Sequence, residues 1–287
     1  MRYLHMTSWL MAAVFLIFPS VVQANEELLI RQNNPAEWVM QNGNFSATRY
    51  SALAQINTEN VSKLKVAWSF STGVLRGHEG GPIVIGDTLY IHTAFPNNVF
   101  ALDLNNEGRI LWEYRPKQDP SVPGVMCCDT VNRGVAYAEG KIFLYQADAT
   151  LVALDAKTGR PLENWGAPVS LEGFSEGGVL DLIPNLVEDW GPWQSHLAGG
   201  ERYDPDHGIP RELGMVTSSA PPIVVNGVVV VLIGHEPSYD QTRIENVPGD
   251  IMGFDTKTGE FLWKFHVIPR PGEFGHETWE NDAWQWS

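Results

Sequence analysis

The chain has 287 residues, of which 44% are hydrophobic and 18% charged, a composition typical of a globular protein with a sizeable core. Its net charge of −15 argues against nucleic acid and anionic membrane surfaces as partners, because both need a basic patch. The 11 Trp, 27 Gly and 19 Pro predict many short strands separated by turns, with large rings packed between them.

Residues 1–24 have the pattern of a secretory signal peptide. Arg2 precedes an apolar run from Trp9 to Phe18, and Val22-Gln23-Ala24 supplies the small-residue stop before a cleavage site. The apolar run is too short to span a bilayer, and no later run reaches the roughly 20 residues that a spanning helix needs. We therefore expect residues 25–287 to be exported into an oxidising periplasm.

A meander of four short strands is predicted three times along the chain. The expected strands are residues 82–85, 88–92, 99–103 and 110–114 in the first copy, 134–137, 141–145, 151–155 and the segment around Trp165 in the second, and 222–225, 228–233, 251–255 and 261–265 in the third. An Asp-x-x-Thr-Gly hairpin and a trailing Trp recur in the repeat. This pattern predicts an all-β fold, a β-propeller of four-stranded antiparallel blades.

Two segments do not fit the repeat. Residues 166–214 are rich in Gly, Pro and acidic residues and lack paired strand signals, so we expect an insertion over one face, with short helical turns between residues 180 and 190. Lys65–Phe70 is predicted to be a lone strand before the first blade. Because a propeller usually has about 4–8 blades, three blades and an abrupt end at Ser287 indicate the front portion of a longer protein.

Cys127 and Cys128 are adjacent and are the only cysteines of the chain. Neighbouring Cα atoms lie about 3.8 Å apart, closer than the roughly 4.4–6.8 Å of an ordinary disulfide, so a bond between them would close a small strained ring. Strain of this kind often marks a functional site. The alternatives are this vicinal disulfide and two buried free thiols in a strand, and export favours the disulfide.

The residues around these features resemble a known family. Thr48–Leu53 and Phe70–Gly73 resemble the N-terminal region of dehydrogenases of the methanol and ethanol dehydrogenase type, which depend on pyrroloquinoline quinone (PQQ). His78–Pro82, Tyr90–Asn98 and Cys127–Gly134 resemble the methanol dehydrogenase branch. The family fold is an eight-bladed propeller, so the resemblance implies that residues 25–287 form its N-terminal part.

The resemblance also implies residues that bind PQQ. In the family the vicinal disulfide lies flat against one face of the quinone, which assigns Cys127 and Cys128 to that contact. Hydrogen bonds in the plane of the cofactor fall to Glu79 and Arg133, and an arginine fork suits a carboxylate or carbonyl oxygen. The structural alternatives are a solvated loop acid for Glu79 and a surface salt bridge for Arg133.

Further positions follow from the same resemblance. A cofactor-binding hydroxyl falls on Ser218 or Ser219, although ordinary turn chemistry would use the same side chains. The family's calcium or lanthanide site points to Glu236, but a hard cation needs several oxygen ligands. The Asp general base of the family lies beyond Ser287, so we assign no catalytic base to this chain and expect residues 25–287 alone to show no turnover.

The function implied is that of a periplasmic quinoprotein dehydrogenase that passes electrons to a cytochrome c or a membrane quinone. Val267–Gly272 and Glu277–Trp284 resemble the membrane glucose dehydrogenase type, so the substrate is either a small alcohol or a sugar or polyol. A non-catalytic periplasmic propeller scaffold of the outer-membrane assembly type is the alternative. Such a scaffold needs neither Cys127-Cys128 nor Glu79, which favours the enzyme.

Overall fold

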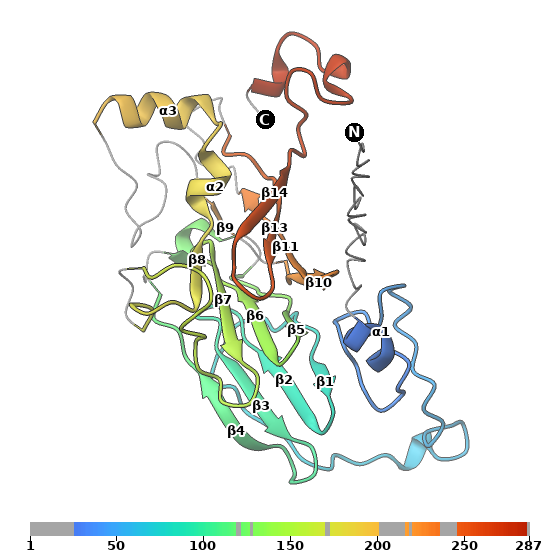
Figure 1. Ribbon diagram of the computed structural model, residues 1–287. Coiled ribbons are helices and arrows are strands. Elements are labelled where there is room, and N and C mark those ends of the chain that lie inside the picture. The colour runs from blue at the N-terminus through green and yellow to red at the C-terminus, as the bar shows by residue number, and fades with distance from the viewer. Residues whose placement is uncertain are drawn as a thin grey trace, which may run out of the picture.

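The structure is a computed structural model that describes residues 26–118, 122–126, 129–169, 173–200, 216–217, 220–235 and 246–285 (Figure 1). The predicted signal peptide, residues 1–24, lies outside the described residues. In the described part of the chain, no helix is long and apolar enough to cross a membrane.

Three antiparallel sheets of four strands each form the body of the protein, and they are stacked face to face (Figure 1). The strands are β1 (Ile83–Ile85), β2 (Thr88–His92), β3 (Val99–Asp103) and β4 (Arg109–Tyr114) in the first sheet, β5 (Val135–Ala138), β6 (Lys141–Tyr145), β7 (Thr150–Asp155) and β8 (Val179–Asp181) in the second, and β10 (Ile223–Val225), β11 (Val228–Leu232), β13 (Ile251–Asp255) and β14 (Phe261–Phe265) in the third. The predicted propeller architecture of four-stranded blades is confirmed.

Short elements surround these three blades. The helices are α1 (Glu26–Arg31), α2 (Ile183–Val187) and α3 (Gly191–Ala198), and a two-stranded sheet pairs β9 (Val216–Thr217) with β12 (Gly234–His235). Single 3-10 turns occur at Val61–Lys63, Val122–Val125, His276–Thr278 and Ala283–Gln285. Helical structure between residues 180 and 190 was expected, and α2 lies there.

The recurring Asp-x-Lys-Thr-Gly hairpin has a local cause. Asp155 Oδ1 accepts hydrogen bonds from the backbone N–H of Lys157 at 3.0 Å and of Thr158 at 2.8 Å. Asp255 Oδ1 does the same at Lys257 and Thr258, at 2.8 Å in both cases. The carboxylate therefore replaces the backbone acceptor of a turn, which explains why the motif reverses the chain directly after the third strand in two blades.

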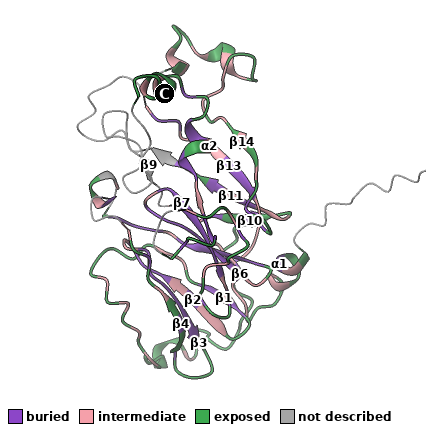
Figure 2. Cartoon of the chain, turned by 60° about the vertical axis from the view of Figure 1, so that its left-hand side comes forward, coloured by how far each residue is buried: buried purple, intermediate pink, exposed green. Residues whose placement is uncertain are grey.

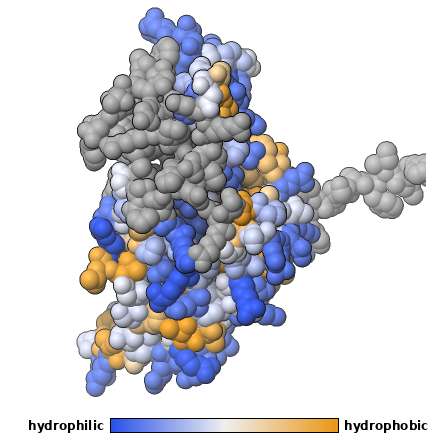
Figure 3. All heavy atoms as spheres, turned by 90° about the vertical axis from the view of Figure 1, so that its left-hand side faces the viewer, coloured by the Kyte–Doolittle hydropathy of each residue, from blue (hydrophilic) through white to orange (hydrophobic). Residues whose placement is uncertain are grey.

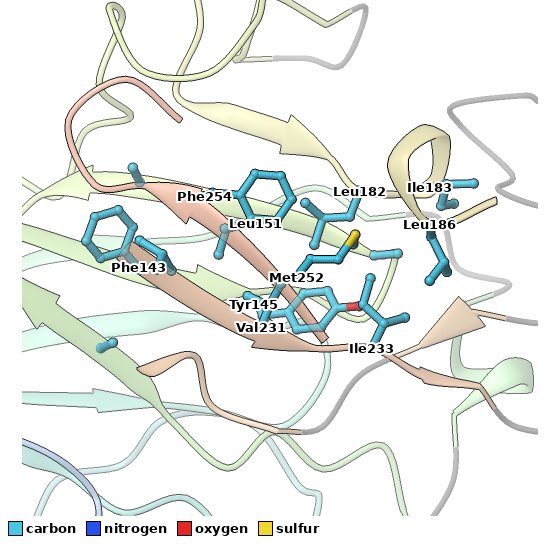
Figure 4. Close-up of a cluster of buried hydrophobic side chains, with 14 of the residues drawn as sticks. Phe143, Tyr145, Leu151, Leu182, Ile183, Leu186, Val231, Ile233, Met252 and Phe254 are labelled. Carbon is cyan, nitrogen blue, oxygen red and sulfur yellow. The ribbon is translucent and has the colours of Figure 1, made fainter. Parts of the chain in front are cut away.

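Two hydrophobic cores lie between the blades, so β6 and β7 are buried on both faces (Figure 2). The core between the first and second blades contains Tyr90, Trp112, Leu144 and Leu154. In the core between the second and third blades, Phe143, Tyr145 and Leu151 meet Val231, Met252 and Phe254 (Figure 4). Burial on both faces accounts for the nearly continuous apolar sequence of β6 and β7.

The outer strand of the second blade differs from the prediction. It was expected around Trp165, but β8 pairs with the first half of β7, and Pro161 forms an isolated bridge with Leu154 at the other end of that strand. Trp165 turns into the core between blades, where its ring centroid lies 5.7 Å from that of Phe143. The interpretation of residues 166–214 as an insertion without a paired strand is therefore wrong for Val179–Asp181.

The strand predicted at Lys65–Phe70 is absent, since this described segment pairs with no strand. Its aromatic rings lie against the first blade: Phe70 packs edge-on against Phe100 with centroids 5.1 Å apart, and Trp68 covers Gly108. The inner edge of the first blade is taken by another segment, since Trp38 exchanges backbone hydrogen bonds of 3.0 and 2.8 Å with Val84 of β1. Lys65–Phe70 therefore contacts side chains of the blade without joining its sheet.

Apolar side chains are also exposed at the surface. On the face shown in Figure 3 they form small groups separated by polar residues. The outer strand β4 exposes Ile110 and Leu111, and the third blade exposes Ile223, Val225 and Phe265 on the side away from the second blade. The second blade is thus covered by blades on both faces, whereas the third is covered on one face within the described chain.

Candidate functional site

Glu79 and Arg133 lie in two loops that precede the inner strands of neighbouring blades, β1 and β5. Arg133 Nη2 lies 2.9 Å from Glu79 Oε2, and both side chains are about half exposed. The backbone N–H of Gly81 also donates to the carbonyl of Arg133 at 3.4 Å. The two loops therefore run side by side, and residues that are distant in the sequence form an ion pair accessible to a ligand.

Beneath this ion pair, His92 and Asn132 join the two blades. His92 Nε2 donates to the carbonyl of Asn132 at 2.9 Å, and Asn132 Nδ2 donates to the carbonyl of Tyr145 at 2.9 Å. Burial lowers the pKa of His92 to about 4, so its ring is neutral at ordinary pH. Gly80 lies against this ring so closely that a Cβ atom there would overlap it.

Asp129 makes a second connection between the loops. Its Oδ2 accepts from the backbone N–H of Gly77 at 2.9 Å, and its Oδ1 accepts from Arg76 Nη1 at 3.2 Å. The Gly77 hydrogen bond, followed by that of Arg76, holds the pKa of Asp129 below its usual range. Sequence reasoning did not identify Asp129, His92 or Asn132, although the position of Asp129 directly after the cysteine pair was an available signal.

The other predicted site residues lie outside the described residues. These are Cys127, Cys128, Ser218, Ser219 and Glu236. Among the residues that the structure does describe, no group of three or more His, Cys, Asp or Glu side chains is placed to hold a metal ion. The roles assigned to all five, and to a metal ion, therefore stay predictions.

A cavity of about 230 Å³ lies between residues 39–47 and the inner strands β5 and β10. Its lining is mostly apolar and includes Val39, Phe45 and Tyr137. Glu79 and Arg133 are not among the lining residues, so the cavity offers no charged group of the predicted site.

The predicted disulfide between Cys127 and Cys128 can be tested by alkylation. We expect intact-mass analysis of the exported protein to show no alkylated thiol before reduction and two afterwards, because the chain has only these two cysteines. Two alkylated thiols in the native, non-reduced protein would contradict the disulfide.

The neutral His92 makes a testable contribution to the pH dependence of stability. The unfolded chain takes up this proton near pH 6.5, whereas the folded protein takes it up only near pH 4. The contribution is therefore constant above about pH 6.5 and is lost as the pH falls, by about 3 kcal/mol at pH 4. Urea unfolding between pH 4 and 7 should show this component in the natural protein and not in His92→Gln. An identical pH dependence in both proteins would show that His92 is not buried in neutral form.

Comparisons with known proteins agree with the fold. A family profile described as PQQ, glucose/ethanol/alcohol dehydrogenase, beta-propeller domain matches residues 38–287. The chain is 57% identical over 161 residues to the lanthanide-dependent methanol dehydrogenase of Methylorubrum extorquens, an alignment covering 56% of this chain and 26% of the relative. It is 36% identical to subunit 1 of the methanol dehydrogenase [cytochrome c] of Paracoccus denitrificans, with 91% of this chain and 38% of the relative covered.

A solved structure, the europium-containing methanol dehydrogenase, superimposes with a TM-score of 0.64 at 38% identity and covers 84% of this chain and 34% of that chain. The chain thus spans between a quarter and two fifths of the length of these relatives. The profile match covers most of the chain and includes Glu79, Arg133 and all three blades. The chain therefore belongs to the β-propeller family of PQQ-dependent glucose, ethanol and alcohol dehydrogenases.

Proposed function

We propose that residues 25–287 are the N-terminal part of a periplasmic quinoprotein dehydrogenase that oxidises a small alcohol with PQQ as its cofactor. One observation carries the proposal. The structure brings Glu79 and Arg133 into an ion pair of 2.9 Å at the loops before β1 and β5, and Arg133 follows Cys127-Cys128 in one of these loops. The motifs that resemble the family's cofactor contacts thus belong to neighbouring loops.

The chemistry of this pair fits PQQ. The cofactor bears three carboxylates and an ortho-quinone, and the guanidinium of Arg133 can donate two parallel hydrogen bonds to such oxygens. Glu79 neutralises Arg133 and can accept a hydrogen bond from the cofactor. When bound, PQQ supplies the two-electron acceptor for alcohol oxidation. Arg133 and Glu79 bind and orient it, and Cys127 and Cys128 are proposed to cover one of its faces.

A metal ion beside the cofactor is part of the proposal. One relative is named lanthanide-dependent, and we propose calcium or a lanthanide here. Glu236 would supply one carboxylate, and because such hard cations take about 6–8 oxygen ligands, other groups must complete the site. Ser218 or Ser219 is proposed to donate a hydroxyl to PQQ.

Relatives that use different electron acceptors support two routes for the electrons. One relative is named a methanol dehydrogenase [cytochrome c] subunit, and another is named an alcohol dehydrogenase (quinone). We propose that the acceptor is a cytochrome c or a membrane quinone. A small alcohol is the favoured substrate, with a sugar or polyol as the alternative. Assays of the protein purified from its source cells with methanol, ethanol and glucose decide between them.

Binding of PQQ is the direct test of this function. Residues 25–287 should bind PQQ saturably, and Arg133→Gln should weaken binding about 10- to 100-fold, because it removes a charge-assisted hydrogen bond worth about 1.5–3 kcal/mol. Arg115→Gln is the matched control, since Arg115 also forms an exposed ion pair, with Glu113 at 3.0 Å, and its loss changes the net charge equally. Fluorescence titration measures both. Equal weakening by the two variants would show that the Arg133 effect is only one of net charge, and the absence of saturable binding would contradict the assignment of Glu79 and Arg133 to a PQQ site.

A further inference from the structure

Asp129, which directly follows the cysteine pair, has an unusual backbone conformation. Asp129 and Thr130 both have left-handed backbone angles, with φ of 64° and 61°. Two such residues in succession are unfavourable for non-glycine side chains and persist only where the surroundings hold them. Thr130 is held because it is buried and its carbonyl accepts from the N–H of Phe95 at 2.9 Å. Asp129 is exposed, so the contacts of its side chain are what can hold it in this conformation.

Those contacts reach the loop of Glu79. The hydrogen bond from the Gly77 N–H to Asp129 Oδ2 is 2.9 Å long, and it fixes a peptide only two residues before Glu79. A Cβ atom at residue 77 would lie 3.2 Å from Asp129 Oδ2, so this close approach suits a glycine. Arg76 joins the same carboxylate from Nη1 at 3.2 Å. Asp129 therefore connects one end of the loop that carries Glu79 to the loop that carries Arg133.

The other end of this loop is attached next to Arg133. The N–H of Gly81 donates to the Arg133 carbonyl at 3.4 Å, and Glu79 lies between this contact and the one at Gly77. We propose that Asp129 is a positioning residue, whose carboxylate holds residues 76–79 so that the carboxylate of Glu79 meets Arg133 and is presented to the cofactor. The role in cofactor binding rests on the proposed function.

The stability of the fold and this positioning can be measured separately. The side chains of Asp129 and Arg76 are 55% and 54% exposed, and exposed ion pairs contribute about 0–1 kcal/mol to stability. Loss of Asp129 should therefore leave the fold intact, with nearly the same thermal midpoint. Loss of Asp129 should nevertheless shift the position of Glu79, because no other described group accepts a hydrogen bond from the Gly77 N–H.

The first measurement needs no cofactor. In residues 25–287, amide hydrogen exchange at Gly77 should become about 10-fold faster in Asp129→Ala, whereas Asp129→Asn, whose side-chain oxygen can still accept, should retain most of the protection. Asp129→Gly, which adopts the left-handed backbone without strain and lacks the acceptor, should exchange as fast as Asp129→Ala. Unchanged exchange in the Ala and Gly variants would overturn the proposal.

The second measurement compares PQQ affinity between variants of equal charge. Asp129→Ala should bind PQQ about 5- to 10-fold more weakly than Asp129→Asn, and this difference should vanish when Glu79 is also replaced by alanine. A difference that persists without Glu79, or equal affinities in the two single variants, would show that Asp129 does not act through Glu79. If the natural sequence binds no PQQ, the proposed function fails, and the exchange measurement alone decides whether Asp129 positions the loop.

Discussion

Gly80→Ala should destabilise the protein by about 2–6 kcal/mol and separate Glu79 from Arg133. The added Cβ would overlap the imidazole of His92, which is buried and hydrogen-bonded to the carbonyl of Asn132. The ring can give way only by losing that hydrogen bond, so the cost combines overpacking, about 1–3 kcal/mol, with a buried group left without its partner, about 1–3 kcal/mol. Denaturant unfolding measures the loss.

Two variants control this result. Gly191 begins α3, and nothing lies within 4 Å of the position of its Cβ, so Gly191→Ala should leave stability unchanged or raise it by up to about 1 kcal/mol. In a His92→Ala background, where the ring is gone, Gly80→Ala should cost little. A large cost in that background would mean that His92 is not the obstacle and that Gly80 is needed for another reason.

Trp112→Ala should cost about 3–5 kcal/mol, the usual range for removal of a buried Trp. Trp112 is 8% exposed, and its Nε1 donates at 2.9 Å to the carbonyl of Ala156, in the hairpin of the next blade. The same carbonyl accepts from the hydroxyl of Tyr90 at 3.1 Å, and Gly159 leaves room for the indole ring. The Trp112 side chain therefore joins the first blade to the second.

The third blade contains the matched control for this prediction. Trp263 lies opposite Gly253 as Trp112 lies opposite Ala101, so the two occupy the same position in the repeat. Trp263 is 39% exposed, and Trp263→Ala should cost less than half as much as Trp112→Ala. Similar losses of unfolding free energy for the two variants would show that contact with the next blade is not what stabilises Trp112.

The repeat could be predicted because its signals are local. Strands β2 and β13 have the bounds that their apolar runs and flanking turns predicted, and the hairpins at Asp155 and Asp255 depend on side chains within three residues. Strand β8 was missed because Val179-Leu180-Asp181 is too short to show periodicity and follows Gly177 and Gly178, both of which have positive φ.

The candidate site was predictable only in part, for a related reason. The meeting of Glu79 and Arg133 followed from motifs that resemble those of a family, and the structure contains it. The contacts of His92 with the Asn132 carbonyl and of Asp129 with the Gly77 N–H involve backbone groups, which every residue has. A sequence does not distinguish one backbone amide from another, so these partners could not be read from residue types.

The N-terminal segment that closes the inner edge of the first blade has a consequence for synthesis. Glu27 Oε2 accepts from the N–H of Glu139 at 3.0 Å, 112 residues later, and Gln41 Nε2 donates to the carbonyl of Val135, 94 residues later. A ribosome that adds about 5–20 residues per second therefore leaves Glu27 of α1 without this partner for at least roughly 6–22 s. Leu28 and Val39, both buried in the finished protein, face water or a chaperone during that interval. This N-terminal segment thus reaches its final contacts only after about 100 further residues have been made, and slowing of translation between residues 41 and 139 would lengthen the time during which the nascent chain can aggregate.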